Sequence, residues 1–265
     1  MEENSSTDWQ PTEPRNGEDS ETPRMSEVST LANIFFEPGN TFEDLRRKPR
    51  FIMALVLISL LVTAYGLGVY YKVGEAGVRR FITEQIDRNP RTESLSAEQK
   101  TGAVDMQMKI QGVVRYAMPV FVAVSLLLGG LLYWLAAKAF GGTGNFLHGL
   151  SVFLYSSIPP TVIAMVANFI ILAFKSADDI DIAASQRGLV HANPGILLDG
   201  KTMPVLATLV GTLDIFMIWG WILAAIGLRI TNRLSSGSAW AIVLIFALIG
   251  TTFRVVGAVF SGNPY

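Results

Sequence analysis

The chain has 265 residues, of which 50% are apolar and 16% are charged, with a formal net charge of −1 and a mean hydropathy of +0.39. A soluble enzyme of similar length is far more polar, so the composition excludes that class and indicates a chain surrounded mostly by lipid. The absence of cysteine excludes disulfides, thiolate nucleophiles and cysteine-bound metals, and two histidines are too few for most zinc or haem sites, so we expect neither a metal nor another cofactor.

Residues 1–29 are predicted to form a disordered acidic tail. They are rich in Glu, Ser, Thr, Pro and Asn, so they cannot bury enough apolar surface to offset the entropy that ordering would cost. Their acidic side chains outnumber the two arginines and repel nucleic acid, which we therefore do not expect as a partner. Protein partners can still reach such a tail.

Residues 30–50 are predicted to form an amphipathic segment at the membrane interface. Their aromatic side chains flank a Pro38-Gly39 turn, which suits the boundary between lipid headgroups and acyl chains. A basic cluster next to a span attracts anionic headgroups by about 1 kcal/mol per charge. The predicted headgroup contacts are Arg46, Arg47, Lys48 and Arg50. The alternative is that these charges only set the topology.

Residues 51–265 are predicted to form an all-α polytopic membrane domain with five transmembrane helices. Each apolar stretch is near the roughly 20 residues that a helix needs to cross the hydrocarbon. Basic connections fall on the side of the Arg46 to Arg50 cluster, which puts the N-terminus in the cytoplasm and the C-terminus outside. The predicted spans are residues 51–71, 116–139, 151–174, 204–228 and 239–260.

The connection between the first two spans, residues 72–115, is predicted to form an outer amphipathic helical insertion. Apolar residues recur at helical spacing until Asn89-Pro90 ends the first helix. A second helix should begin near Ser96, where Gln99 completes a capping box. This helix is expected to run into the second span, with a kink near Pro119.

One acidic and one basic residue lie deep inside the predicted spans, away from their ends. Asp214 lies about ten residues, or roughly 15 Å, below the outer end of the fourth span, and Arg254 lies about six residues, or roughly 9 Å, below that of the fifth. An arginine can bridge this difference, and a charge at such depth needs a partner, so we expect an ion pair. Asn168 in the third span is expected to join it as a hydrogen-bond donor. The pair would either fix neighbouring helices or belong to a proton or ion pathway.

Two stretches rich in proline or glycine allow more than one interpretation. Pro159-Pro160 predicts either an ordinary kink, satisfied by neighbouring hydroxyls, or the broken helix of a transporter site. We favour the kink, because no second span is interrupted at a matching place. Residues 141–145 are similar to a phosphate-binding loop, but they follow an apolar span and lack its Lys-Ser/Thr ending. They are therefore predicted to be a helix stop and turn.

Four stretches recur in the order typical of one known family: the IFFEPGNTFEDLRRKP lead-in, a Gly-Gly turn after the second span, LYSSIPP in the third and LDIFMIWGWILAAIGL in the fourth. From about Ile34 onward the chain resembles the Yip1 domain family, in particular its prokaryotic members. The resemblance implies a five-helix protein of the bacterial plasma membrane with a cytoplasmic N-terminus. Eukaryotic relatives are associated with Rab GTPases and vesicle trafficking, but this chain lacks their Asp-Leu-Tyr-Gly-Pro signature, so GTPase binding is not carried over.

The predicted function is that of a non-enzymatic scaffold or adaptor in membrane organisation or trafficking, with an N-terminal segment that contacts cytoplasmic proteins. The alternative is a component of a small-solute or ion permease that uses the region of Asp214, Arg254 and Asn168. An enzyme is not expected, because no nucleophile, base and orienting group recur within reach of one another.

Overall fold

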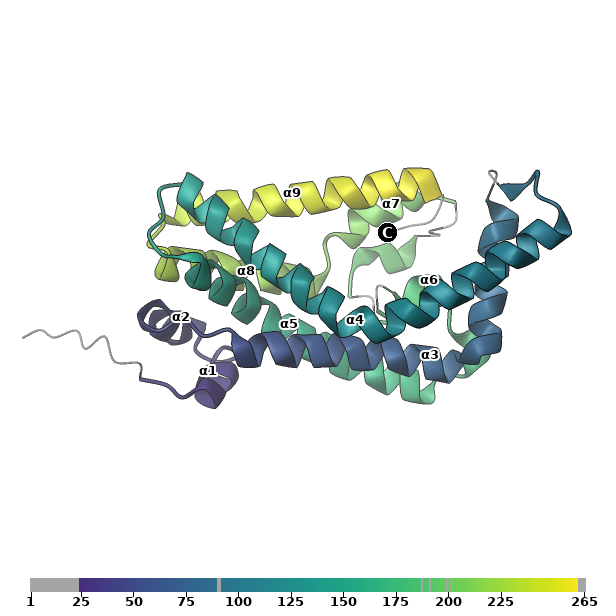
Figure 1. Cartoon of the computed structure of the whole chain (residues 1–265). Helices are drawn as coiled ribbons and strands as arrows, with labels where there is room; N and C mark the ends of the chain where they lie inside the picture. The colour runs from purple at the N-terminus through teal and green to yellow at the C-terminus, as the bar shows by residue number, and fades with distance from the viewer. Residues whose placement is uncertain are drawn as a thin grey trace, which may run out of the picture.

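The structure is a computed structural model that describes residues 24–89, 92–186, 188–190, 192–198, 200 and 202–261. Every regular element in those ranges is a helix, and Figure 1 shows their arrangement. The α-helices are α1 (Glu27–Asn33), α2 (Pro38–Arg47), α3 (Ile52–Arg88), α4 (Ala97–Ala139), α5 (Phe146–Phe174), α6 (Ile182–Ser185), α7 (Pro204–Gly211), α8 (Ile215–Thr231) and α9 (Ser236–Ser261). Two short 3-10 turns, η2 (Ala177–Asp179) and η3 (Pro194–Leu197), lie in the connection from α5 to α7.

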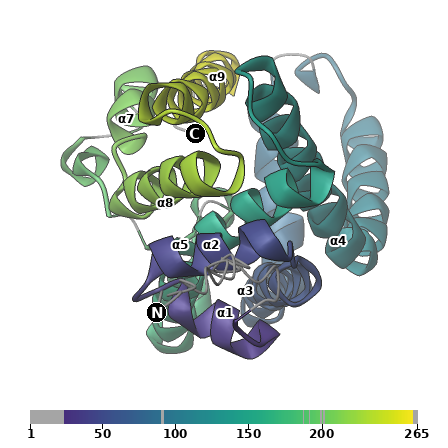
Figure 2. The same ribbon diagram turned by 90° about the vertical axis from the view of Figure 1, so that its left-hand side faces the viewer.

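Four helices are long and apolar enough to cross a membrane, namely α3, α4, α5 and α9. A fifth crossing is formed by α7 and α8 if the bend of 43° between them lies within one span. The predicted all-helical polytopic fold is therefore confirmed. One end of the bundle carries α1, α2 and the α4–α5 and α8–α9 turns, as Figures 1 and 2 show. The basic connections thus share one end with α2, as the charge pattern predicted.

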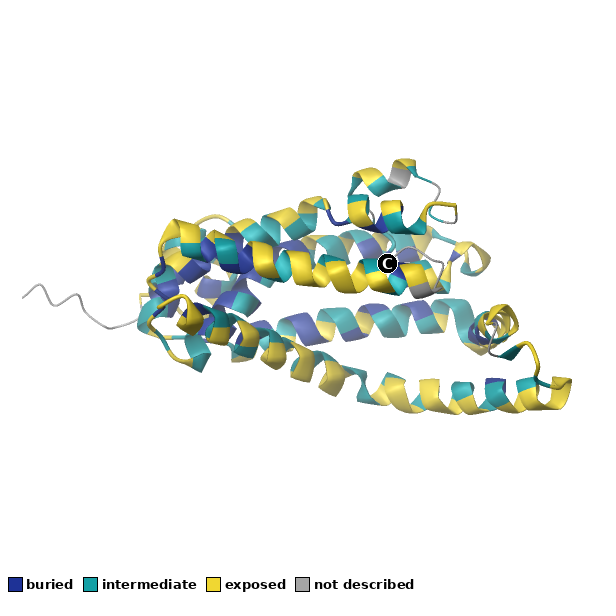
Figure 3. Ribbon diagram, turned by 90° about the horizontal axis from the view of Figure 1, so that it is seen from above, coloured by how far each residue is buried: buried dark blue, intermediate teal, exposed yellow. Residues whose placement is uncertain are grey.

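The hydrophobic core is concentrated at the end that carries α1 and α2. Phe42 of α2, Leu150 and Tyr155 of α5, and Leu228 of α8 are almost fully buried there in one cluster. Figure 3 shows buried residues gathered at this end, while exposed residues run along the outward faces of the long helices. Many of those exposed side chains are large and apolar, as expected of helices that lipid surrounds.

The α1–α2 pair packs against this end of the bundle. Ser26 caps α1 by accepting the backbone N–H of Ser29 at 3.1 Å. The apolar face of α2 packs on α8, where Gly227 leaves room for the ring of Phe42, since a Cβ at Gly227 would lie 2.8 Å from a ring carbon. Helix α1 begins at Glu27, inside the stretch predicted to be disordered. The rest of that prediction, residues 1–23, lies outside the described residues.

Beyond the predicted spans, α3 and α4 continue as a helical hairpin that we call the arm, made of residues 75–88 and 97–115. The chain changes direction inside α3 at Gly74, whose φ of +74° is a conformation that glycine adopts without strain. Helix α4 then begins with the predicted capping box, in which Ser96 and Gln99 bond reciprocally.

Ion pairs and a small apolar cluster hold the two helices of the arm together. Arg79 pairs with Asp105 at 2.7 Å and Lys100 with Asp87 at 3.0 Å, while the apolar cluster lies between the helices. Exposed pairs contribute little each, so the apolar contacts set the geometry. The cluster consists of Val78, Ile82 and Val104. The predicted insertion is thus a continuation of α3 and α4. Helix α3 ends at Arg88, just before the Asn89-Pro90 pair where the break was expected, and Pro90 lies outside the described residues.

Prolines lie inside two of the long helices without breaking them. Pro119 lies within the continuous α4, which changes direction near its middle in Figure 1. Pro159 and Pro160 lie within the continuous α5, and the hydroxyls of Ser156 and Ser157 donate to the carbonyl of Phe153 at 3.0 and 2.8 Å. The third span is therefore one continuous helix and not the broken helix of a transporter site. The stated reason for favouring the kink does not hold, because the fourth span is interrupted between α7 and α8.

Residues 141–145 form the predicted helix stop and turn. Gly141 and Gly144 have φ values of +82° and +115°, in the left-handed region where helices commonly end. Asn145 then caps α5 in a capping box with His148. The turn is anchored to the neighbouring connection, because the N–H of Thr143 donates to the carbonyl of Asn232 at 2.9 Å.

Candidate functional site

The fourth predicted span is not one helix, and Asp214 lies at its break. Helix α7 ends at Gly211 and α8 begins at Ile215, with a bend of 43° between them. Asp214 is the N-cap of α8, and its Oδ1 accepts the N–H of Phe216 at 2.9 Å. The prediction of a continuous helix over residues 204–228 was wrong, because an aspartate can bond to nearby backbone N–H groups and so starts a helix more readily than it continues one.

The second carboxylate oxygen of Asp214 holds the connection that leads from α5. Its Oδ2 accepts the N–H of Ala192 at 3.1 Å and the side-chain amide of Asn193 at 3.2 Å. In return, the N–H of Ile215 donates to the carbonyl of Ala192 at 3.1 Å. The acid is therefore satisfied by hydrogen bonds at the break. His191, the second histidine of the chain, lies outside the described residues.

Two further side chains hold the same connection from other helices. The buried Asn168 of α5 accepts the N–H groups of Leu189 and Val190 through its Oδ1. The hydroxyl of Tyr65 in α3 donates to the carbonyl of Ser185 at 3.0 Å. Asn168 thus acts as an acceptor for the connection and not as the predicted donor to the ion pair. The sequence contains no pattern that relates Asn168 to residues 189 and 190, so this role could not be predicted.

Among the described residues, Arg254 of α9 has no carboxylate partner. Its Nη1 lies 3.2 Å from the Sδ of Met217, and no ion pair joins it to Asp214 or to another acid in the part of the chain that the structure describes. The predicted Asp214–Arg254 ion pair was therefore wrong. The helix break supplies the acid with backbone donors, which removes its need for the arginine.

Arg50 is a structural residue and not the predicted headgroup contact. Only 8% of it is exposed, and its Nη1 lies 3.0 Å from Asp44 Oδ2 and 2.6 Å from Thr30 Oγ1. Its guanidinium also donates to the carbonyls of Met25 and Ser26. Asp44 is 2% exposed and faces the arginine from the buried side of α2. The fold provides this buried acid, so Arg50 turns away from the lipid surface.

The other three residues of the basic cluster remain at the surface. Arg46 forms a pair with Glu43 at 2.7 Å one turn back along α2, and its carbonyl lies 3.1 Å from His148 Nε2. Arg47 is half-buried and Lys48 is exposed. Contact of these residues with lipid headgroups stays a prediction.

The sequence model of one known protein family matches most of the residues that form this fold. The Yip1 domain matches residues 32–257, from within α1 to within α9. The chain belongs to the Yip1 domain family. The Yip1 domain therefore includes the α1–α2 cap, the arm and the broken fourth span, together with the long helices.

A bacterial relative supports the prokaryotic branch of the Yip1 family. Membrane protein YknW of Bacillus subtilis (strain 168) is 25% identical over 242 residues, which cover 89% of this chain and 91% of that protein. No solved structure resembles the chain at a significant level. This Yip1 domain protein is thus an integral membrane protein, and its long apolar helices contact the lipid bilayer.

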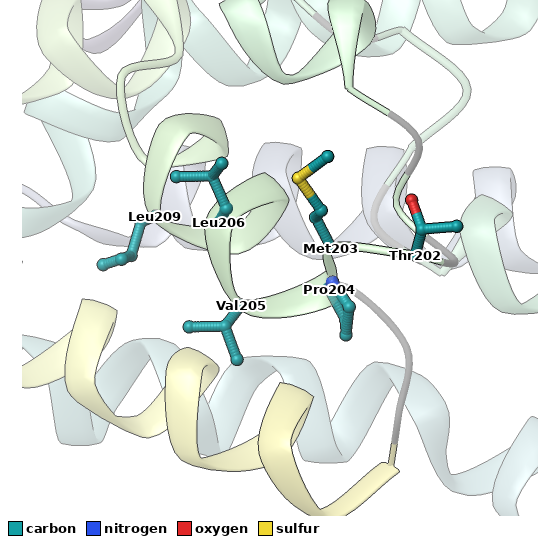
Figure 4. A pocket seen from close by; sticks show the side chains of 6 residues that line it. All are labelled: Thr202, Met203, Pro204, Val205, Leu206 and Leu209. Atoms are coloured by element: carbon teal, nitrogen blue, oxygen red, sulfur yellow. The ribbon is translucent and has the colours of Figure 1, made fainter.

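Two surface cavities of the Yip1 domain differ in the chemistry they offer. One, of about 430 Å³, lies along α7 and is lined by Thr202, Met203, Pro204, Val205, Leu206 and Leu209, as Figure 4 shows. None of these six lining residues is charged. The other, of about 260 Å³, lies between α4, α5, α8 and α9 and has Arg254 in its wall. Among the described residues, no group of three or more His, Asp or Glu side chains is arranged to hold a metal ion.

Replacing Asp214 with alanine should lower the free energy of unfolding by about 1–2 kcal/mol, because α8 loses its N-cap. Asp214→Asn keeps an oxygen acceptor and should cost less. Because Arg254 does not contact the acid, the effects of Asp214→Asn and Arg254→Gln should add within about 0.5 kcal/mol. Denaturant unfolding in detergent micelles measures the free energy of unfolding of each single variant and of the double variant. A departure from additivity larger than about 0.5 kcal/mol would be evidence for an Asp214–Arg254 ion pair.

Proposed function

We propose that this Yip1 domain protein is a non-enzymatic membrane scaffold or adaptor that binds other proteins at both ends of the bundle. The observation that supports this function is the arm. Helix α4 has 43 residues, or about 64 Å at the helical rise, which is roughly twice the thickness of the hydrocarbon core. Its N-terminal half therefore extends beyond the predicted second span.

The arm presents an apolar stripe on that extension. Met106, Ile110 and Val113 recur at helical spacing and are 66%, 46% and 69% exposed. Residues four and then three apart lie on one face of a helix. Side chains at this spacing are the anchors by which a helix docks into an apolar groove of a partner. The stripe therefore fits a protein partner with such a groove.

At the opposite end, the α1–α2 cap positions the start of the acidic tail. The network of Arg50 with Asp44 fixes this cap on the bundle, so a partner bound to the tail is held at a fixed place on the membrane. We assign this end to the cytoplasmic side of a bacterial inner membrane, because the basic connections lie there. Single cysteines at Ser235 and Thr101 test the orientation in intact cells, since an impermeant thiol reagent should label only Thr101→Cys.

A photo-crosslinking amino acid at Met106 or Ile110 should give an adduct of defined mass with a protein partner in native membranes. The same amino acid at Thr101, exposed elsewhere on α4, is the matched control and should not. Crosslinking and pull-down require no assumption about the partner. Adducts that are equal at all three positions, or that contain only lipid, would contradict a docking role for the stripe. If deletion of residues 2–23 leaves every crosslinked partner unchanged, the tail does not bind a partner protein.

The alternative is that the protein is a component of a small-solute or ion permease. The broken fourth span favours this function. Discontinuous helices form substrate sites in many transporters, near the point where the two halves meet. Asp214 lies at the break between the two half-helices α7 and α8 and is half-buried. Solute flux into liposomes that depends on Asp214, with Asp214→Asn still folded, would support the permease. A scaffold should give no flux above that of protein-free liposomes.

A further inference from the structure

The cavity between α4 and α9 is a groove with an aromatic floor. Tyr133 of α4 stacks on Phe246 of α9 with ring centroids 5.3 Å apart, and it meets Phe153 of α5 edge-on at 5.2 Å. Trp221 of α8 completes the lining on the inner side. Figures 1 and 3 show α4 and α9 diverging from the end that carries the α4–α5 turn. We call this feature the α4–α9 groove.

The groove is shaped for an extended apolar chain. Its lining residues on α9 run from Val243 to Arg254, which is about 16 Å along the helix. Gly250 lies in this lining, and a Cβ added there would meet nothing within 4 Å, so the groove has unfilled space at this point. Leu132, on the α4 side, is exposed to the surroundings. The groove is therefore accessible from the lipid that surrounds the bundle.

Arg254 places one positive charge at the end of this groove. It lies about 27 Å along α9 from Ser236, close to the thickness of about 30 Å expected for the hydrocarbon core. With Ser236 taken as the inner boundary, the guanidinium lies near the level where headgroups begin, shallower than the predicted span of residues 239–260 implied. No acid lies beside it among the groove-lining residues. A cation in such a place needs an anion, and a phosphate accepts the forked N–H groups of arginine in a bidentate manner.

We propose that the α4–α9 groove binds one anionic phospholipid of the surrounding bilayer. The phosphate contacts Arg254, and one acyl chain lies along Gly250 and Phe246 against the ring of Tyr133. The charge selects an anionic headgroup, while the apolar floor and the open side facing lipid select a membrane lipid over a soluble anion. This site is distinct from the basic surface of Arg47 and Lys48, which lies at the other end of the bundle.

Native mass spectrometry of the full chain in detergent tests this site, with phosphatidylglycerol and phosphatidylcholine of identical acyl chains as the probes. The measurements use an Arg47→Gln, Lys48→Gln background, so that the second basic surface does not contribute. Both lipids carry a phosphate, but the choline cation of phosphatidylcholine cancels its net charge and is repelled by Arg254. The protein should therefore bind phosphatidylglycerol about tenfold more tightly than phosphatidylcholine, a difference of about 1.4 kcal/mol. Arg254→Gln should remove this preference and Arg254→Lys should retain most of it.

A separate substitution tests the part of the groove that would hold the acyl chain. Gly250→Leu fills the groove without meeting a neighbouring atom at Cβ and should reduce the binding of both lipids. Gly112→Leu is the matched control, since Gly112 is also a helical glycine with open space around it but lies on α4 away from the groove, and it should leave both affinities unchanged. A preference that survives in Arg254→Gln, or unchanged binding in Gly250→Leu, would overturn the proposal.

Discussion

Arg50→Ala should lower the free energy of unfolding by about 3–5 kcal/mol. The substitution leaves the carboxylate of Asp44 buried with no cation beside it, while Thr30 Oγ1 and the carbonyls of Met25 and Ser26 lose their donor. Because α1 and α2 meet through this network, the cap should detach before the bundle unfolds.

Unfolding in mixed micelles, followed by circular dichroism, measures this loss. Arg46→Ala is the matched control, because it removes a partly exposed pair from α2, the helix that carries Asp44, and should cost no more than about 1 kcal/mol. Replacing both partners, as in Arg50→Met with Asp44→Leu, should cost less than Arg50→Ala alone, since no charge remains buried. Equal costs for Arg50→Ala and Arg46→Ala would show that the buried pair does not hold the cap.

Gly149→Ala should destabilise the protein by about 1–3 kcal/mol by forcing α4 and α5 apart. A Cβ at Gly149 would lie 2.7 Å from the backbone N and Cα of Trp134, and one at Gly130 would lie 2.8 Å from Cα of Leu150. Backbone atoms cannot move aside as the end of a side chain can. Small residues allow such close approach between membrane helices, where packing supplies much of the association energy.

Gly102→Ala controls for the change in helix propensity. Gly102 is in α4, and a Cβ there meets nothing within 4 Å. The same substitution should therefore stabilise the protein by up to about 1 kcal/mol, because alanine favours a helix more than glycine does. Thermal unfolding of both variants in detergent compares them directly. A Gly149→Ala variant as stable as Gly102→Ala would show that α4 and α5 tolerate a wider separation.

The sequence by itself determined which stretches are apolar enough to cross a membrane and where several helices begin and end. A span must be continuously apolar and must satisfy its own backbone hydrogen bonds, so a local pattern is enough to identify it. The capping box at Ser96 and the stop at Gly141 are likewise local, because each depends on residues within a few positions. The same local view misplaced Asp214, since a single acid in an apolar stretch shows its charge but not the helix start that it forms.

Only the tertiary structure decided which partner each charged side chain takes. Arg50 and Lys48 belong to one basic cluster in the sequence, yet only Arg50 lies beside a buried acid. The reason is that a polar group bonds to whichever donor or acceptor the fold brings within about 3 Å. Thr30 is 20 residues from Arg50 and Ala192 is 22 residues from Asp214, and no periodicity in the sequence relates positions that far apart.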